Sequence, residues 1–310
     1  MSGTGGGNRL GSLTSVSNLL AAHLDPLWQA TPRQVCHNAG QFYVDFAKGG
    51  SVMRLAGRVA AITGGTRGIG RGIAEAYLAE GAQVVLSGRT VEKGERALEE
   101  MNAGDNAHFI AGDARNQADV EAFVDGAIER YGKVDILVNN AGGSSGFAPI
   151  AEMGDEAWNE ALNWMLNATF WGTRRALPGM IDRGWGRIIN ISSVEGKLIN
   201  KTTVGHYIVN KQAIGALTKV VAFENGPLGV TCNAILPGAV ETDLMAITGR
   251  NAAESMGMTY EEYLDGYAQE AAIKRINTVE EVAAVALLLA SDVGGGITGA
   301  EVDVHGGTAL

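Results

Sequence analysis

The residues best suited to do chemistry are Tyr207 and Lys211, which lie four positions apart in the segment 206–225. On a helix this spacing places both side chains on one face, so the ammonium can sit near the phenol. A unit charge at about 4 Å, in an effective dielectric of about 20, stabilises a phenolate by roughly 4 kcal/mol, or about three pK units. Lys211 is therefore expected to lower the pKa of Tyr207 toward neutrality, where a phenol can act as a general acid or base.

A second candidate site is the glycine-rich segment Thr63 to Gly70, which directly follows the apolar run Val59 to Ile62. This pattern is typical of a strand that turns into a helix around a phosphate, with the helix N-terminus facing the anion. Gly64 permits the tight turn, Gly68 lets the backbone approach a pyrophosphate, and Gly70 allows close packing of helix on strand. We therefore expect a nucleotide to bind here.

Composition and charge exclude several classes of function. The chain has 310 residues, is 46% hydrophobic and contains no long apolar stretch free of charges, which argues against membrane spans. Its net charge of -10 repels polyanions and so argues against a nucleic-acid partner. Cys36 and Cys232 lie far apart and lack metal-ligand spacing, which predicts no metal, no disulfide framework and a reducing compartment such as the cytoplasm.

Residues 1–56 differ in character from the rest and are expected to form an N-terminal extension. The first stretch, Ser2 to Gly7, has the composition of a flexible segment. A capping box at Thr31 to Gln34 and apolar residues at helical spacing then predict a helix over 32–48, which Gly49 and Gly50 would end. We favour a docked helix over a cleaved transit peptide, which would place the protein in the mitochondrial matrix.

From Arg58 onward, short β-rich runs alternate with helical patterns, which predicts an α/β fold. The runs lack strict polar and apolar alternation, as expected for parallel strands covered by helices on both faces. The expected architecture is a doubly wound, Rossmann-type sheet of seven parallel strands, preceded by the helical extension. The seven predicted strands are Val59 to Thr63, Gln83 to Ser87, His108 to Ala111, Ile136 to Asn139, Arg187 to Ser192, Thr231 to Leu236 and Glu301 to Val304.

Four motifs in order resemble the short-chain dehydrogenase/reductase family over residues 57–310, taken as one catalytic domain. They are the Thr63 to Gly70 loop, Asn139-Asn140-Ala141-Gly142, the Tyr207 and Lys211 pair, and Pro237-Gly238 with Thr242. The resemblance implies hydride transfer with a nicotinamide cofactor. It also implies cofactor contacts from Gly64, Thr66, Arg67, Gly68, Ile69, Gly70, Arg89, Asp113, Asn140, Ala141, Gly142, Tyr207, Lys211, Pro237, Gly238 and Thr242.

The choice between NADP(H) and NAD(H) depends on the end of the second predicted strand. Family members that use NAD place an acidic residue there, whereas Leu86-Ser87-Gly88-Arg89 offers no carboxylate and puts an arginine nearby. Arg67, inside the glycine loop, is a second cation that can fork onto phosphate oxygens. NADP(H) is therefore the preferred cofactor, with NAD(H) as the alternative.

The resemblance also assigns catalytic roles and points to one departure from the family pattern. Ser193 stands where the family places the serine that binds the substrate oxygen, next to Tyr207 and Lys211 as catalytic residues. The family's asparagine on the preceding long helix is replaced by Met165, with Asn163 and Asn167 two positions to either side. A shift of two residues turns a side chain about 200° around a helix, although a local bulge could bring Asn167 inward. Because Met165 retains the main-chain carbonyl that the family uses, activity is still expected.

Two further features follow from the resemblance. Residues 239–276 correspond to a helical lid over the substrate, and their methionines and tyrosines suit an apolar substrate. The two long helices, about Glu156 to Arg183 and His206 to Asn225, together with the last strand, are the surfaces through which family members form dimers or tetramers. A homo-oligomer is therefore expected.

The sequence thus predicts an NADP(H)-dependent oxidoreductase that interconverts a ketone and a secondary alcohol on a small-molecule substrate, with Tyr207 as general acid and base. One alternative is a reductase of 3-oxoacyl thioesters. Another is an NADP(H)-binding sensor or interaction protein with weak turnover, in which Met165 has removed the proton relay.

Overall fold

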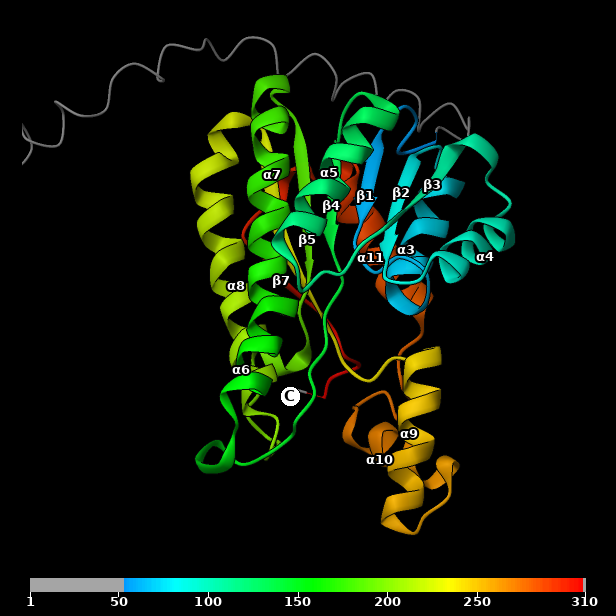
Figure 1. Ribbon diagram of the computed structural model, residues 1–310, viewed down its shortest axis with the longest axis vertical. Helices are drawn as coiled ribbons and strands as arrows, with labels where there is room; N and C mark the ends of the chain where they lie inside the picture. Colours follow the sequence, from blue (N-terminus) through cyan, green and yellow to red (C-terminus); the bar gives the residue numbers. More distant parts are fainter. Residues whose placement is uncertain (1–52, 309–310) are drawn as a thin grey trace, which may run out of the picture. The chain divides into compact units, whose positions relative to one another are not determined.

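The computed structural model describes residues 53–308, which fold around one central sheet (Figure 1). All seven predicted strands are present, and every pairing between them is parallel. Their order across the sheet is β3-β2-β1-β4-β5-β6-β7. The strands are β1 (Val59–Ile62), β2 (Gln83–Gly88), β3 (Ala107–Ala111), β4 (Ile136–Asn139), β5 (Gly186–Ile191), β6 (Val230–Pro237) and β7 (Glu301–Val304).

Nine longer helices connect and flank these strands within the described part of the chain. They are α3 (Gly68–Ala79), α4 (Val91–Met101), α5 (Gln117–Tyr131), α6 (Asp155–Leu162), α7 (Ala168–Arg183), α8 (Gly205–Asn225), α9 (Asp243–Met256), α10 (Tyr260–Glu270) and α11 (Val279–Ala290). The doubly wound α/β prediction is confirmed. The predicted helix over 32–48 lies outside the described residues.

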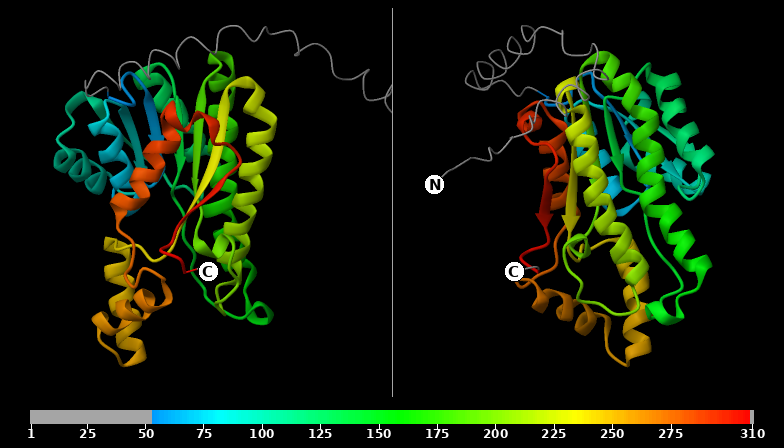
Figure 2. Two further views of the ribbon diagram at one scale, coloured as in Figure 1. Left: turned by 180° about the vertical axis from the view of Figure 1, so that it is seen from behind. Right: turned by 90° about the vertical axis from the view of Figure 1, so that its left-hand side faces the viewer.

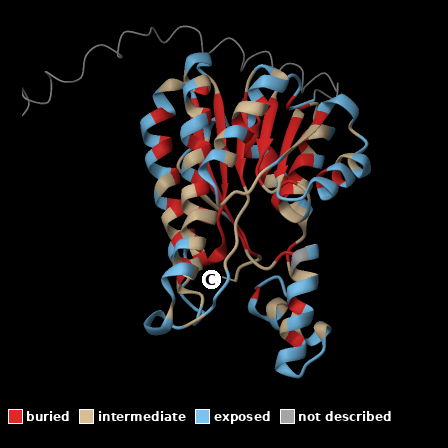
Figure 3. Ribbon diagram, viewed as in Figure 1, coloured by how far each residue is buried: buried red, intermediate tan, exposed pale blue. Residues whose placement is uncertain are grey.

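The continuous apolar character of the strands follows from burial on both faces. All four residues of β1 are buried, and the side chains of residues 60–62 alternate between two cores. Ala60 and Ile62 face the core built with α3 and α11, whereas Ala61 faces the core built with α5, α7 and α8. Figure 2 shows α11 in front when the sheet is viewed from behind, and Figure 3 shows the buried strands between exposed outer helix faces.

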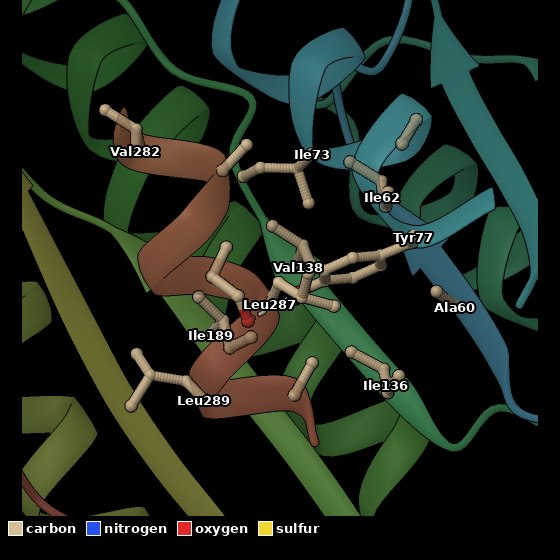
Figure 4. Close-up of a cluster of buried hydrophobic side chains, with 14 of the residues drawn as sticks. Ala60, Ile62, Ile73, Tyr77, Ile136, Val138, Ile189, Val282, Leu287 and Leu289 are labelled. Atoms are coloured by element: carbon tan, nitrogen blue, oxygen red, sulfur yellow. Dashed lines mark hydrogen bonds between the residues drawn. The ribbon is translucent and has the colours of Figure 1, made fainter. Parts of the chain in front are cut away.

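The first core fixes the helix that follows the glycine loop. Ile73 and Tyr77 of α3 pack with Val282 and Leu287 of α11 against strand side chains such as Ile62 (Figure 4). The buried Tyr77 hydroxyl donates a hydrogen bond of 3.0 Å to the carbonyl oxygen of Ala286, so its polar tip is satisfied inside an apolar cluster. This packing holds the N-terminus of α3 at the carboxyl edge of the sheet.

The strand order places a topological switch point between β1 and β4. The chain leaves β1 toward β2 and β3 on one side, and continues from β4 toward β7 on the other. Connections that diverge in this way leave a crevice at the carboxyl ends of the two central strands, where α/β proteins bind ligands. Helices α9 and α10 extend beyond this same edge of the sheet (Figure 1). Within residues 53–308, no helix is long and apolar enough to cross a membrane.

Candidate active site

A cavity of about 370 Å³ opens at the carboxyl edge of the sheet and brings the separate sequence motifs together. It extends from the glycine loop after β1 to Tyr207 and Lys211 on α8. All the predicted site residues line it except Gly70. The lining residues that are not among the predicted site residues are Ser87, Gly88, Gly112, Ala114, Trp164, Ile191, Ser192 and Val240.

The glycine loop forms one end of the cavity and has the shape of a backbone cradle. Gly64 and Gly68 have φ angles of +67° and +54°, a region that residues with a Cβ rarely adopt. A Cβ on Gly70 would lie 2.5 Å from both the Gly64 carbonyl oxygen and the Asn140 amide nitrogen. Gly70 therefore contributes by packing and not by lining the cavity, because its missing side chain lets α3 approach the glycine loop closely.

Asn140 and Thr63 brace this cradle against the end of β4. The Asn140 side chain donates to the carbonyl oxygens of Thr63 at 2.9 Å and Gly64 at 3.1 Å. In return, the Thr63 hydroxyl accepts from the main-chain amides of Asn140 and Ala141, both at 3.0 Å. The neighbouring Asn139 instead ties β4 to β5 through Asn190 at 2.9 Å. The motif at 139–142 therefore has a structural role as well as lining the cavity.

Arg67 and Arg89 supply positive charge at the glycine-loop end. Arg67 precedes α3 and Arg89 follows β2, and both side chains are exposed while lining the cavity. At the end of β2, Ser87 and Gly88 line the cavity, and no carboxylate side chain lies among the lining residues of this strand. The residues present therefore fit a nucleotide that carries a ribose phosphate better than one with free ribose hydroxyls.

Asp113 lines the same end, and its carboxylate is already engaged. Arg115 donates to both of its oxygens, with the closest contact at 2.5 Å, and this guanidinium lowers the pKa of Asp113. Arg115 also pairs with Glu160 of α6 at 2.6 Å. The predicted cofactor contact of Asp113 must therefore be made beside this ion-pair network. Arg115 is not among the predicted site residues, although its position two residues after Asp113 is a signal for the pair.

At the other end of the cavity, Tyr207 and Lys211 lie on one face of α8, as the spacing predicts. The Lys211 ammonium nitrogen donates to the carbonyl oxygen of Ile191 at 2.8 Å and lies 5.5 Å from the centre of the Tyr207 ring. Ser192 donates to the main-chain carbonyl of Lys211 at 2.9 Å and so ties the end of β5 to α8. Strand β5 thereby positions the lysine.

The expectation that Lys211 brings the pKa of Tyr207 toward neutrality is wrong for this geometry. Burial raises the pKa of Tyr207 to about 12, a hydrogen bond with Ser193 lowers it, and the charge of Glu195 raises it. Burial also lowers the pKa of Lys211 to about 8, against an opposing effect of Glu195. Desolvation therefore dominates the pKa values of both groups, an effect that the expected interaction between the two charges leaves out.

Ser193 caps the short helical turn η5 (Val194–Gly196) and contacts a buried acid that the sequence did not point to. The Ser193 hydroxyl donates to a carboxylate oxygen of Glu195 and accepts a hydrogen bond of 3.4 Å from the Glu195 main-chain amide. Lys201 pairs with the other carboxylate oxygen at 2.6 Å. The position of Glu195 on a turn gave no periodic pattern from which its burial could have been predicted.

Met165 lies where the chain departs from the expected helix. Residues Asn163–Asn167 form a π-helical segment, η4, between α6 and α7. Met165 is fully buried, with Ala161 and Ile214 in a cluster against which Tyr207 packs. The amide of Asn167 donates to Asn163 at 2.7 Å, so the bulge pairs these two side chains with each other. The Met165 carbonyl accepts a hydrogen bond of 2.8 Å from the Thr169 hydroxyl.

Comparisons with known proteins match this arrangement. The family model for short chain dehydrogenase matches residues 58–252. The chain is 38% identical to 3beta-hydroxysteroid dehydrogenase 2 of Eggerthella lenta, over 82% of this chain and 95% of that protein. It is 34% identical to the 3-oxoacyl-[acyl-carrier-protein] reductase of Aquifex aeolicus, over 82% of this chain and 98% of that protein.

Two solved structures, both determined with NADPH, have the same fold. A variant actinorhodin polyketide ketoreductase superposes with a TM-score of 0.76 at 35% identity, covering 81% of this chain and 97% of that one. The L-sorbose reductase of Gluconobacter frateurii, solved with NADPH and L-sorbose, gives 0.78 at 32% identity, covering 83% and 98%. From the family model and the extent of these matches, the chain belongs to the short-chain dehydrogenase/reductase family.

Proposed function

We propose that this protein is an NADP(H)-dependent oxidoreductase that interconverts a ketone and a secondary alcohol. The observation that carries the proposal is a single cavity with a glycine cradle and two arginines at one end, and Tyr207, Ser193 and Lys211 at the other. A substrate that shared this cavity with a dinucleotide would have a proton donor within reach. The similarity to two NADPH-containing reductases supports the same reading.

The glycine cradle, Arg67 and Arg89 are the groups that would hold the phosphates of NADP(H). Gly68 and Ile69, at the start of α3, line the cavity, and the helix dipole favours an anion there. The two guanidinium groups give the added positive charge that a ribose phosphate requires. When bound, NADPH supplies the hydride that the carbonyl carbon must receive.

The proton that completes the reduction comes from Tyr207. As the carbonyl carbon gains a hydride, its oxygen gains the electron pair of the broken π bond and must be protonated. The Tyr207 hydroxyl donates that proton and leaves a phenolate, and in alcohol oxidation the phenolate takes the proton back. The pKa of about 12 keeps Tyr207 protonated near neutral pH, which is the form that can donate a proton to a carbonyl oxygen.

Lys211 supports this step as a buried cation fixed by the main chain. Its pKa of about 8 leaves most of the side chain protonated near neutrality. The hydrogen bond to Ile191 holds the ammonium beside the Tyr207 ring, where it stabilises the phenolate that forms. We assign Lys211 as the residue whose positive charge offsets the negative charge that develops on Tyr207. We assign Ser193 as the residue that binds the substrate oxygen.

Among carbonyl substrates, we favour free ketones over carrier-bound 3-oxoacyl thioesters. The thioester alternative is supported by the similarity to the reductase of Aquifex aeolicus. Helix α10, however, exposes Glu261, Glu262 and Asp265 beyond the carboxyl edge of the sheet. These charges disfavour the phosphate of a phosphopantetheine arm and the surface of an acidic carrier.

We also propose a homo-oligomer that uses α7 and α8. Both helices carry large apolar side chains that are exposed in the single chain, including Phe170 on α7 and Val220 and Phe223 on α8. Phe223 is 88% exposed, which is costly for a residue of this size unless another chain covers it. Light scattering of the purified chain measures the mass directly.

The test of the proposed function is an assay of the full chain with NADPH and NADH. The carbonyl panel holds free cyclic and aryl ketones and the 3-oxobutanoyl thioester of N-acetylcysteamine. We expect NADPH to be oxidised with free ketones. With these ketones kcat/KM should be higher for NADPH than for NADH, and with NADPH it should be higher for the ketones than for the thioester. A faster thioester reaction would support the 3-oxoacyl reductase, and NADPH binding without oxidation across the panel would support a nucleotide-binding protein instead.

A further inference from the structure

His206 is a buried histidine that the proposed reaction does not use. It directly precedes Tyr207 in the first turn of α8, and 0% of its surface is exposed. Burying an imidazole costs free energy that only its hydrogen bonds can offset. Its Nε2 atom lies 2.9 Å from the main-chain carbonyl oxygen of Ser145. Because a carbonyl oxygen can only accept, Nε2 carries a proton and is the donor in this bond.

Ser145 lies in the segment 143–148, which follows the end of β4 and begins directly after Gly142. Gly142 lines the cavity, and a Cβ on it would lie 3.7 Å from the Lys211 ammonium nitrogen. Figure 1 shows that the chain then runs beyond the carboxyl edge of the sheet on the side of α6 and α8, with α9 and α10 on the other side. The segment 143–148 therefore continues the wall of the cavity at the end that holds Tyr207.

A second hydrogen bond ties the same segment to the residues just before α8. The Ala148 amide donates to the carbonyl oxygen of Thr203 at 3.0 Å. Thr203 has a φ angle of +65°, a left-handed conformation that β-branched residues rarely adopt. Such a backbone conformation persists only where the surrounding structure fixes it. The Phe147 ring adds a third contact, because it meets the His206 ring edge-on with the ring centres 5.9 Å apart.

The side chain of Ser145 is held by the ion pairs of the nucleotide end. Its hydroxyl donates to Glu160 at 2.6 Å, and Glu160 pairs with Arg115. The hydroxyl is thus bound to α6, and the carbonyl oxygen is bound to α8 through His206. Ser145 is itself exposed, so water can satisfy its carbonyl oxygen if the imidazole is lost. Loss of the imidazole would therefore release the segment from α8 without leaving the Ser145 carbonyl unsatisfied.

We propose that His206 is a positioning residue that holds the segment 143–148 against α8 and so shapes the end of the cavity where the ketone binds. The inference rests on the proposed function. The segment contacts the bound ketone away from the reacting carbonyl, so its release weakens binding of the ground state and of the transition state equally. The consequence is that His206 controls KM for the ketone, with little effect on kcat or on the affinity for NADPH.

The first test is steady-state reduction, with saturating NADPH, of the ketone that is turned over fastest in the panel above. His206→Leu removes the donor, so KM for the ketone should rise about tenfold while kcat changes by less than about 3-fold. His206→Gln places an amide donor near the position of Nε2 and should restore most of the affinity. Asn225→Leu is the matched control, because Asn225 is also a buried polar residue of α8, but its amide donates to Val221 of the same helix at 2.9 Å. Its KM should not change.

The second test does not require turnover. Hydrogen exchange of the full chain, followed in peptides that cover residues 143–151, reports whether the segment is held. Exchange in His206→Leu should be at least about tenfold faster than in the unchanged protein, because release of the segment breaks the bond from the Ala148 amide to Thr203. In His206→Gln and in Asn225→Leu, exchange of these peptides should stay near that of the unchanged protein.

The outcomes separate this inference from the proposed function. If the unchanged protein reduces no ketone, the proposed function fails, and exchange alone then decides whether His206 holds the segment. If the unchanged protein is active, an unchanged KM or unchanged exchange in folded His206→Leu overturns the inference while the function stands. A fall in kcat at constant KM, or no recovery in His206→Gln, overturns it as well. Should His206→Leu fail to fold, His206→Asn, whose shorter side chain ends before Ser145, decides by the same two measurements.

Discussion

The guanidinium carbon of Arg89 lies 5.6 Å from the centre of the Trp164 ring, so the end of β2 meets the π-helical segment η4 over the cavity. Arg115 lies 5.7 Å from the same ring centre. A tryptophan face attracts cations, so Trp164 helps to hold both guanidinium groups at the nucleotide end. Arg89 is thereby partly organised in advance for the phosphate contact that we propose.

Arg89→Ala tests the choice of cofactor. A charge-assisted hydrogen bond contributes about 1.5–3 kcal/mol, so its loss should raise the Kd for NADPH by about 10- to 100-fold. The Kd for NADH should change by less than about 3-fold, since NADH lacks the phosphate. Quenching of tryptophan fluorescence measures both, with Arg96→Ala, an exposed arginine on α4 outside the cavity lining, as the matched control. Equal weakening of both nucleotides would contradict a phosphate contact.

Gly70→Ala tests the close approach of α3 to the glycine loop. The added methyl would lie 2.5 Å from the Gly64 carbonyl oxygen and from the Asn140 amide, both fixed by hydrogen bonds to each other. We expect the free energy of unfolding to fall by about 1–3 kcal/mol and the affinity for NADPH to fall with it. Gly266→Ala on α10, where nothing lies within 4 Å, should instead be neutral or stabilising. Chemical denaturation of both variants decides, and equal stabilities would contradict the model of the loop.

The sequence predicted the fold and most of the cavity because these features depend on local pattern. The apolar run at 59–62 predicts a buried strand by itself, and the glycines of the loop predict the turn that follows it. The contacts of Glu195 and Arg115 had weaker signals, because an acid on a turn or an arginine after a strand is usually a solvated charge. The π-helical segment at 163–167 was foreseen as a possible bulge, but its effect on Asn167 depends on packing that no local pattern contains.

Met165→Asn tests whether the departure from the family pattern limits the reaction. The main-chain carbonyl stays in place, so we expect kcat to change by less than about 3-fold. A buried amide without a partner costs about 1–3 kcal/mol, so the Tm should fall by several degrees. Met165→Leu, which keeps the volume and polarity, is the control for packing. An increase in kcat of tenfold or more in Met165→Asn alone would show that the missing amide limits turnover.

Lys211 predicts a particular dependence of stability on pH. Burial lowers its pKa from 10.5 to about 8, so between these values the unfolded chain binds more protons than the folded one. Stability must therefore rise with pH across this window and be lost as pH falls from 10.5 toward 8. Lys211→Met removes the cost of burying this ammonium. The free energy of unfolding of the variant should therefore exceed that of the unchanged protein most below pH 8, and the difference should shrink as the pH rises to 10.5. Urea denaturation along a pH series measures the gap, and a constant gap would contradict a buried ammonium.

The central claim is that Tyr207 delivers the proton in carbonyl reduction, and Tyr207→Phe tests it most directly. The change removes one hydroxyl and keeps the ring that packs beside Met165. The measurement is a single-turnover reaction in which the preformed NADPH complex is mixed with excess ketone and NADPH absorbance is followed. We predict a rate about 10²- to 10⁴-fold lower than that of the unchanged protein, with the Kd for NADPH unchanged within about 3-fold. An undiminished rate in Tyr207→Phe would contradict the account.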